Sequence, residues 1–385
     1  MSVAIVQLGD VASSIMGQAP PSQDCNTDGV GTPFVKAGEF GTSRPVIREW
    51  TTRPLKFAKR SDVLLCVVGA TCGKINRGED CAIGRSVAAI RPDPDRLDNE
   101  YLYYFLGTWT ERLRKRSQGA AQTVITREMV EDLEMPLPPL AEQRRIAAIL
   151  DKADALRTKR RETIAKLDQL LQSLFSDLFG DPVTNDRAWR DDVKLGDVAD
   201  IASGITKGRR ASGSVRSVPY LAVANVQDRH LRLDSIKSIE ATEAEIDRYR
   251  LLVNDLVLTE GGDPDKLGRG ALWDGSVPDC IHQNHVFRVR VTSKDVDPIF
   301  LNWLVGSSRG KRYFLSVAKQ TTGIASINMS QLKSFPLLIP PIDLQARFSA
   351  MVSAFEKWRF QFGESAKALD HLFESLQQRA FTGKL

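Results

Sequence analysis

One stretch of about forty residues occurs twice in this chain and constrains its fold more than any other feature. Residues 138–179 contain no proline after Pro139, so nothing in them interrupts a long helix. Adding 202 to each residue number carries this stretch onto residues 340–381, with Gln143 falling on Gln345. The offset holds without any insertion, which chance does not produce over such a length. The chain therefore contains an internal duplication.

Both stretches carry apolar residues with a seven-residue period, which predicts two helices that cover each other's apolar seam. Leu150, Ile164, Leu171 and Leu178 widen the apolar stripe of the first helix beyond a bare two-stranded seam. The predicted seam residues are Ile146, Ile149, Leu156, Leu167, Leu170 and Leu174 in the first helix, and Phe348, Met351, Phe355, Trp358, Phe362, Leu369, Leu372 and Leu376 in the second. Each helix would be about 60 Å long at 1.5 Å per residue. Packed antiparallel, the two would form a spacer. The alternative is two unrelated amphipathic helices, each packed on its own domain.

The duplication extends to the regions between the long stretches. VQLGDVASSIMG near the start returns as VKLGDVADIASG, and CAIGRSVAAI returns as CIHQNHVFRV. Strands and helices are mixed without a regular alternation, which indicates an α+β class. We therefore predict two similar modules separated by an intramolecular antiparallel coiled coil in a pseudo-twofold arrangement. The predicted parts are module 1 (1–137), spacer helix 1 (138–180), a linker (181–190), module 2 (191–339) and spacer helix 2 (340–385).

Three elements of module 1 can be predicted from local pattern. The continuous apolar run from Val63 to Val68 predicts a buried strand, and residues 82–92 form a second strand candidate. Residues 99–117 read as a helix with aromatic residues on one side and basic residues at its end. Gly180 and Pro182 are expected to end the first long helix.

Composition narrows the class of protein. Hydrophobic content of 42% and charged content of 26% are ordinary for a globular chain, and no apolar run approaches the ~20 residues of a membrane span. We expect a cytoplasmic protein without membrane contact, because the first residues do not resemble a signal peptide. The five cysteines include no CxxC pair, so neither a disulfide framework nor a metal site is predicted. The net charge of +5 permits nucleic-acid binding without demonstrating it.

Enzyme signatures are missing, and we predict no catalytic residues. GATCGKI resembles a phosphate loop but is one residue too short, and Ile75 follows Lys74 where a serine or threonine would bind magnesium. The chain has no GxGxxG or HExxH motif. The motif of an amino-methyltransferase is also missing. Any such chemistry is expected on partners.

Three segments give the chain a resemblance to the specificity (S) subunit of Type I restriction–modification systems. They are the junction PLPPLAEQRRIAAILDKADAL, the segment SDVLLCVVGATCGKI with its counterpart in module 2, and LFESLQQRAFTGKL. The resemblance covers essentially the whole chain. The second junction departs from the pattern, because Asp343-Leu344-Gln345 replaces Ala141-Glu142-Gln143 and so lacks the glutamate.

The resemblance implies that each module is a target-recognition domain reading one half of a split site in double-stranded DNA. The length of the helix pair would set the unread gap, and the helices would dock two methyltransferase subunits, which restriction subunits join. S-adenosylmethionine, ATP and magnesium would be bound by those partners and not by this chain. A scaffold that binds only proteins, or an enzyme with an unrecognised site, are the alternatives.

Reading bases requires polar groups on loops and cations for phosphates. The candidates in module 1 are Arg44, Arg53, Lys74, Arg77, Arg85, Gln118, Gln122 and Thr123. The candidates in module 2 are Lys207, Arg209, Arg210, Arg216, Asp263, Lys266, Arg269, His282, Gln283, Asn284, His285, Gln320 and Thr321. For any single residue, an ordinary solvated loop is an equally good explanation. A two-histidine metal site in HQNH lacks a third ligand.

Overall fold

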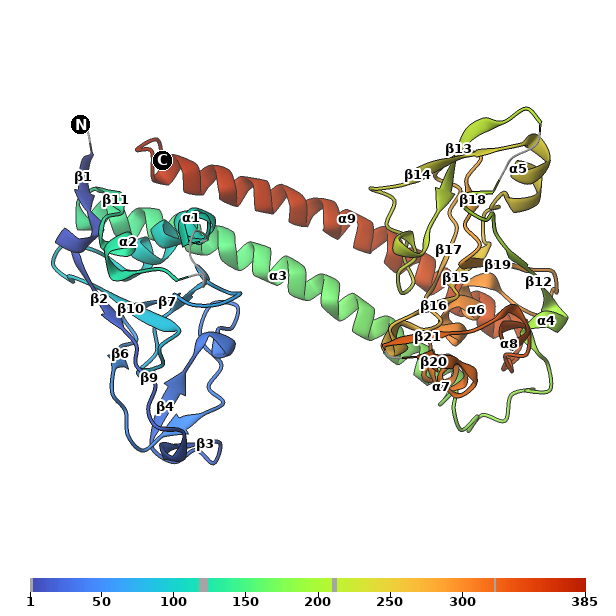
Figure 1. Cartoon of the computed structure of the whole chain (residues 1–385), viewed down its shortest axis with the longest axis horizontal. Helices are drawn as coiled ribbons and strands as arrows, with labels where there is room; N and C mark the ends of the chain where they lie inside the picture. Colours follow the sequence, from blue (N-terminus) through green and yellow to red (C-terminus); the bar gives the residue numbers. More distant parts are fainter. Residues whose placement is uncertain (1–2, 118–123, 210–212, 322) are drawn as a thin grey trace. The chain divides into compact units, whose positions relative to one another are not determined.

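The chain divides into two compact units, which Figure 1 shows in a computed structural model describing residues 3–117, 124–209, 213–321 and 323–385. Unit 1 comprises Met1–Glu162 with Gly363–Leu385, and unit 2 comprises Thr163–Phe362. Each unit thus contains one predicted module together with one part of each long helix. The predicted domain boundaries, by contrast, set the long helices apart from the modules.

The two long helices are present where the sequence predicts them, as α3 (Leu140–Phe179) and α9 (Ile342–Ala380). In unit 1, the first part of α3 shares a core with the last part of α9, where Ile146 and Phe373 are buried together. In unit 2 the opposite ends meet, with Phe175 and Phe348 in one core. Within each unit the helices therefore pair antiparallel, as predicted. Gly180 ends α3 with a φ of 76°, a left-handed conformation that favours glycine.

The predicted seam is wrong in its second position. The buried partner lies four residues after the first seam residue instead of three, at Leu150 and Leu171 in α3 and at Val352 and Phe373 in α9. Four predicted seam residues are exposed: Leu156 (54%), Leu170 (48%), Trp358 (48%) and Leu372 (49%). The reason is that each helix packs on its module as well as on the other helix, which rotates and widens the buried stripe.

The first seam positions fit the prediction better. Ile146 and Phe348 are buried. The other first positions are partly buried: Leu167, Leu174, Phe355, Phe362, Leu369 and Leu376. Of the second positions, Ile149 and Met351 are also partly buried.

Each module contains a four-stranded antiparallel sheet with the same strand order. In unit 1 the order is β2 (Ala12–Met16), β10 (Val87–Pro92), β7 (Val63–Cys66), β8 (Ile75–Arg77). In unit 2 it is β12 (Ala199–Ser203), β19 (Val286–Val291), β15 (Leu256–Thr259), β17 (Gly270–Leu272). The shared topology confirms that the modules are similar. The predicted strand over the Val63 run is confirmed as β7.

A second sheet in each module contains one parallel strand pair. In unit 1 the order is β3 (Cys25–Asn26), β5 (Trp50–Thr51), β4 (Thr32–Val35), β9 (Cys81–Ile83), β6 (Phe57–Ala58), with β4 and β9 parallel. In unit 2 it is β14 (Lys237–Ala241), β13 (Arg216–Leu221), β18 (Ile281–His282), with β13 and β18 parallel. The single strand expected over residues 82–92 is therefore two strands, β9 and β10, which belong to different sheets.

The helices that precede the spacer differ between the units. The predicted helix over residues 99–117 is confirmed as α1 (Asn99–Ser117), whereas its counterpart is divided into α6 (Pro298–Val305) and α7 (Ser308–Val317). The remaining helices are α2 (Arg127–Glu131), α4 (Leu195–Val198), α5 (Glu243–Tyr249) and α8 (Met329–Lys333). Strand β1 (Ala4–Gln7) pairs with β11 (Glu134–Leu137). None of the described helices has the length and apolar character needed to cross a membrane.

Candidate nucleic-acid interface

Three segments of unit 2 that are far apart in the sequence meet at one edge of the module. The loop after β15 forms β16 (Gly261–Gly262), which pairs with β21 (Ile324–Ser326), and β21 pairs in turn with β20 (Lys319–Thr321). The turn between β18 and β19 joins them, because His285 Nδ1 lies 2.5 Å from Glu260 Oε2. This arrangement, which we call the polar edge of unit 2, gathers several of the predicted residues.

The side chains on the polar edge of unit 2 keep much of their hydrogen-bonding capacity. Gln283 is half-buried and Gln320 is exposed, and the amide of Gln320 donates to the Leu315 carbonyl at 3.5 Å, its one side-chain hydrogen bond among the described residues. The amide nitrogen of Asn284 lies 3.4 Å from His285 Nε2. Other predicted residues are engaged nearby: Lys266 pairs with Asp263, and Arg269 donates to Gln227 at 3.4 Å. Thr321 lies in β20, where the structure describes its backbone only.

Unit 1 has an equivalent polar edge, built from the loop after β7 and the segment before α2. Val68 bridges Val124, and the Ile125 amide donates to the Val67 carbonyl at 2.9 Å. Lys74 is exposed and donates through Nζ to the Phe40 carbonyl at 2.9 Å. The predicted residues Gln118, Gln122 and Thr123 lie outside the described residues.

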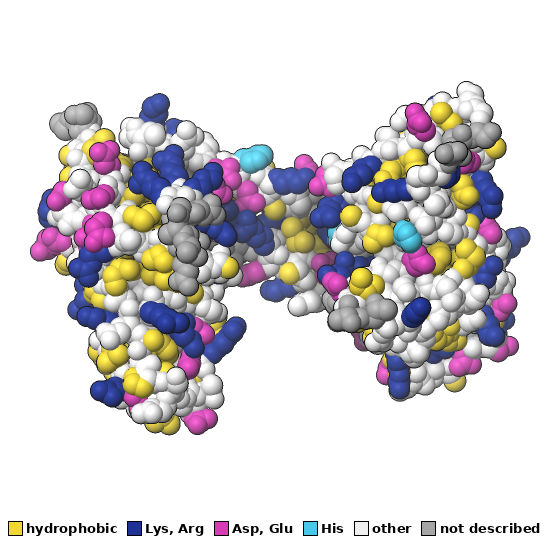
Figure 2. Space-filling view, in the orientation of Figure 1, with side chains coloured by type: hydrophobic (Ala, Val, Ile, Leu, Met, Phe, Trp, Pro, Cys, Tyr) yellow, Lys and Arg dark blue, Asp and Glu magenta, His cyan; other side chains and the backbone are white. Residues whose placement is uncertain are grey.

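Three more of the predicted cations of module 1 are exposed or half-buried. Arg85 occupies the turn between β9 and β10, and it is exposed with no partner among the described residues. Arg53 is also exposed. Arg44 is half-buried, donating to the Gly78 carbonyl and lying 3.8 Å from Glu79. Lys and Arg side chains are visible on both units in Figure 2, interspersed with Asp and Glu.

Besides Lys266, two more of the predicted cations of module 2 are already paired with carboxylates. Arg209 makes a bidentate pair with Glu245, with both distances 2.6 Å, and these bonds lower the pKa of Glu245 to about 2. Arg216 contacts Glu243 at 2.6 Å and Asp279 at 2.8 Å. A phosphate would have to compete with these carboxylates. Lys207 lies exposed with its Nζ 5.2 Å from the Tyr220 ring, and Arg210 is outside the described residues.

His282 is a correction to the predicted set. Its side chain is fully buried, where Nδ1 donates to the Val286 carbonyl at 2.7 Å and Nε2 has no partner among the described residues. Burial lowers the pKa of His282 to about 4, so the ring is neutral. A side chain in this position cannot reach a base edge. The signal was available, since the matching residue of module 1 is Ile83, a core residue.

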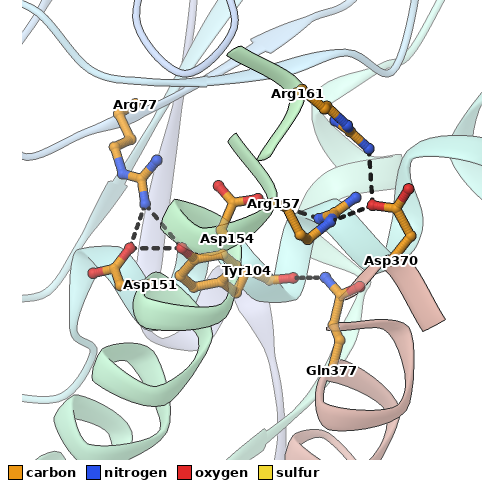
Figure 3. A network of polar contacts seen from close by, with 8 residues as sticks. All are labelled: Arg77, Tyr104, Asp151, Asp154, Arg157, Arg161, Asp370 and Gln377. Carbon is orange, nitrogen blue, oxygen red and sulfur yellow. Dashed lines mark hydrogen bonds and ion pairs between the residues drawn. The ribbon is translucent and has the colours of Figure 1, made fainter. Parts of the chain in front are cut away.

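Arg77 is the second correction, and Figure 3 shows its surroundings. Its guanidinium donates to Glu100 at 2.7 Å and to Asp151 at 2.6 Å, and it lies 4.1 Å from the Tyr103 ring. The Tyr104 hydroxyl donates to the same Asp151 oxygen at 2.6 Å. Arg77 therefore joins β8, α1 and α3 inside unit 1 and does not present its charge to DNA.

Two residues with a candidate functional role were not predicted from the sequence. Gln143 and Gln345 were matched by the repeat but not interpreted, and both are fully buried. No group of three or more metal-ligating side chains occurs among the described residues.

The chain matches known proteins along most of its length. The family model for the type I restriction modification DNA specificity domain matches residues 2–168 and 188–367. A Methanocaldococcus jannaschii protein named as a type I restriction enzyme MjaX specificity subunit is 34% identical over 177 residues, which are 44% of this chain and 41% of that protein. The type I restriction enzyme EcoKI specificity subunit of Escherichia coli is 23% identical over 326 residues, covering 80% of this chain and 69% of that protein.

A solved structure shares the fold. The S subunit of a type I restriction–modification system from M. genitalium superposes with a TM-score of 0.61 at 15% identity, covering 99% of this chain and 96% of that one.

Proposed function

The chain belongs to the type I restriction modification DNA specificity family, and on that premise we propose that it reads a bipartite site in double-stranded DNA. Members of this family are non-catalytic specificity subunits of restriction–modification systems. The observation that carries the proposal is the duplication: the same sheet topology occurs in both units, while the polar edges differ in their side chains. A shared scaffold with different edges is what reading two different half-sites requires.

The chemistry of the edges supports base reading. Gln283, Asn284 and Gln320 carry amides, which pair well with adenine because they donate and accept at once. Module 1 instead presents cations at the exposed positions Arg53, Lys74 and Arg85, which suit phosphates and guanine. Affinity for DNA should consequently fall steeply as salt rises.

The exposed apolar residues of the long helices support the binding of protein partners. Unit 1 exposes Leu156 and Leu372, and unit 2 exposes their counterparts Trp358 and Leu170 at the offset of 202. We infer that these two matched faces dock two methyltransferase subunits, because exposed leucine and tryptophan on an outer helix face mark protein interfaces. Restriction subunits would join that complex, and S-adenosylmethionine, ATP and magnesium would be bound by the partners.

A methylome tests the proposal directly. This chain would be co-expressed with the methyltransferase subunit of its own restriction–modification system in a host lacking adenine methylation, and modified adenines would be mapped by single-molecule sequencing. The expected result is a split motif with a fixed gap that appears only when this chain is present. A soluble complex of both proteins without new methylation would contradict DNA reading and support a protein scaffold.

A further inference from the structure

A buried glutamine joins each long helix to the module that precedes it. In unit 1, Gln143 lies in the first turn of α3 and is fully buried. Its Oε1 accepts from the Asp98 amide at 2.8 Å, and its Nε2 donates to the carbonyls of Arg96 at 2.9 Å and Pro138 at 2.8 Å. One side chain therefore satisfies three backbone groups from two segments.

Unit 2 repeats this arrangement. Gln345 is fully buried in the first turn of α9, and its Oε1 accepts from the Asp297 amide at 2.9 Å. Its Nε2 donates to the carbonyls of Asp295 at 2.9 Å and Pro340 at 2.8 Å. The partners correspond between the two copies. Two copies that differ at most other positions thus keep the same three contacts, which we call the glutamine latch.

The latch connects the beginnings of two helices. The Asp98 carboxylate accepts from the amides of Glu100 and Tyr101 at 3.0 Å, at the start of α1. The Asp297 carboxylate accepts from the Ile299 amide at 2.8 Å and caps α6 in the same way. Since each aspartate amide is bound by the glutamine, the latch fixes the module helix against the long helix at one point.

The residue before each glutamine differs between the two copies, although the contacts of the glutamine latch are the same in both. Glu142 is only half-buried and pairs with Arg145 at 2.7 Å, whereas the matching Leu344 packs against the core of unit 2. The junction therefore tolerates exchange of a charged residue for an apolar one at this position. It retains the neighbouring amide, whose loss would leave three buried backbone groups unpaired.

We infer that Gln143 and Gln345 are positioning residues that fix the direction of each module on its long helix and so fix the gap between the two half-sites. This inference rests on the proposed function. A small rotation of the module about the latch would displace distant residues more than nearby ones, since the module and the helix both extend away from that point. Loosening the latch should leave the recognised bases unchanged and relax the required gap.

The test uses the complex of the full chain with its methyltransferase and duplexes whose gap is correct, or longer or shorter by one base pair. The readout is the ratio of methyl-transfer rates on correct and altered gaps. Because both rates scale with the amount of folded complex, a purely structural defect would not change this ratio. The variants are Gln143→Met and Gln345→Met, and the matched controls are the exposed Gln169→Met on α3 and Gln361→Met on α9.

Both latch variants should lower the ratio roughly 10-fold, since small misplacements of reacting groups have effects of this order. Controls should keep the wild-type ratio. Soluble latch variants with an unchanged ratio would overturn the inference, and Gln143→Glu and Gln345→Glu, which keep the acceptor oxygen, would replace any methionine variant that does not fold. If the wild-type complex methylates no gapped duplex, the proposed function fails and the inference falls with it.

Discussion

The two units place a guanidinium on corresponding aromatic positions but support it differently. In unit 1, Arg77 lies 4.1 Å from the Tyr103 ring and 5.6 Å from that of Tyr104. In unit 2, Arg229 lies 3.9 Å from the ring of Trp303, which matches Tyr104 in the repeat. The arginines come from different segments, since Arg77 ends β8 and Arg229 lies in a turn with a φ of 59°.

Among the described residues, only the first arginine makes an ion pair with carboxylates, whereas Arg229 is influenced by the charges of Asp228 and Asp168 without an ion pair. Glu100 and Asp151 bind Arg77, while the matching positions of unit 2 hold Ile299 and Ser353. Burial opposes the charge of Arg77, but the hydrogen bond and charge of Glu100 raise its pKa overall. Burial lowers the pKa of Arg229, whose Nε has no partner among the described residues. Arg229 instead lines a groove of about 760 Å³ with Ile299 and Ser353.

The helix pair shows the same contrast. In unit 1, Asp370 accepts from Arg157 at 2.7 Å and from Arg161 at 2.9 Å (Figure 3). In unit 2, the matching Arg359 and Asp168 are 3.9 Å apart. Unit 2 relies instead on aromatic contacts around Phe348. One scaffold thus supports a polar junction in one copy and an aromatic junction in the other.

The aromatic junction predicts the largest effect of a single substitution. Phe348→Ala should destabilise unit 2 by about 4 kcal/mol, because the ring is fully buried and contacts Phe175 and Phe179 at 5.5 and 5.4 Å between centroids. The matched Ile146→Ala should destabilise unit 1 by about 3 kcal/mol. Hydrogen exchange measured by mass spectrometry would assign each loss to its unit. Equal losses in both units from either substitution would show that the junctions are not independent.

A second difference should appear as pH dependence confined to unit 2. The folded pKa of His282, about 4, lies below the ordinary value of 6.5, so the unfolded chain binds the proton more readily. Stability should therefore be full above pH 6.5 and fall by about 3 kcal/mol as the pH drops toward 4.

The control is His282→Ile, which introduces the residue found at the matching position of unit 1. Thermal unfolding of this variant would be followed between pH 4 and 7. The stability of its unit 2 should no longer show the decrease that protonation of His282 causes. A variant with the same acid profile as the wild type would place the dependence on other groups.

Removing a carboxylate should affect unit 1 more than the matching change affects unit 2. Asp151→Ala should destabilise unit 1 by about 2 kcal/mol, because it removes a charged partner from both Arg77 and Tyr104. Ser353→Ala should change unit 2 by no more than about 0.5 kcal/mol. Ser353→Asp should stabilise unit 2 by about 1 kcal/mol if its carboxylate reaches Arg229. Urea unfolding combined with hydrogen exchange resolved to each unit measures the change in unfolding free energy of all three variants. Destabilisation by Ser353→Asp would contradict the inference that Arg229 lacks a carboxylate partner that Arg77 has.

The smallest effect is expected from the ion pairs between the long helices. Asp370→Asn should destabilise unit 1 by about 1 kcal/mol, since it weakens two close contacts, and the effect should shrink in high salt. Asp168→Asn should have almost no effect, because its pair is long and partly exposed. A larger loss from Asp168→Asn than from Asp370→Asn would reverse the assignment of the polar junction to unit 1.

Local pattern was enough to predict the long helices and the duplication. The prolines before α3 and α9 and the glycine after α3 set boundaries that the structure moves by only a few residues. Periodicity predicted a widened stripe that includes Leu150 and Leu171, and both are buried. It did not predict which neighbours cover the helices, so the partner positions of the seam were placed one residue too early. A seam predicted for two helices that pack only on each other is wrong where residues of a module also cover the helices.

The candidate site was harder to predict because burial of a polar side chain depends on partners distant in sequence. Arg77 meets Asp151, which lies 74 residues away, and no local signal in KINRGE indicates that pair. Exposure of Gln320 could be inferred from its small-residue loop, but its proximity to other polar segments required the strand pairing. Arg85 fell inside the strand predicted over residues 82–92, and the turn that exposes it was seen only in the structure. His282 could have been placed by aligning the repeats.

The division of the chain between the units bears on how the protein is made. Unit 2 is one continuous segment, whereas unit 1 needs residues 363–385, whose Phe373 and Ala380 complete its core. On the ribosome, the first 162 residues emerge long before this segment, and their apolar surface stays uncovered while unit 2 is synthesised and can fold. Synthesis of unit 1 therefore begins before that of unit 2 and is completed after it.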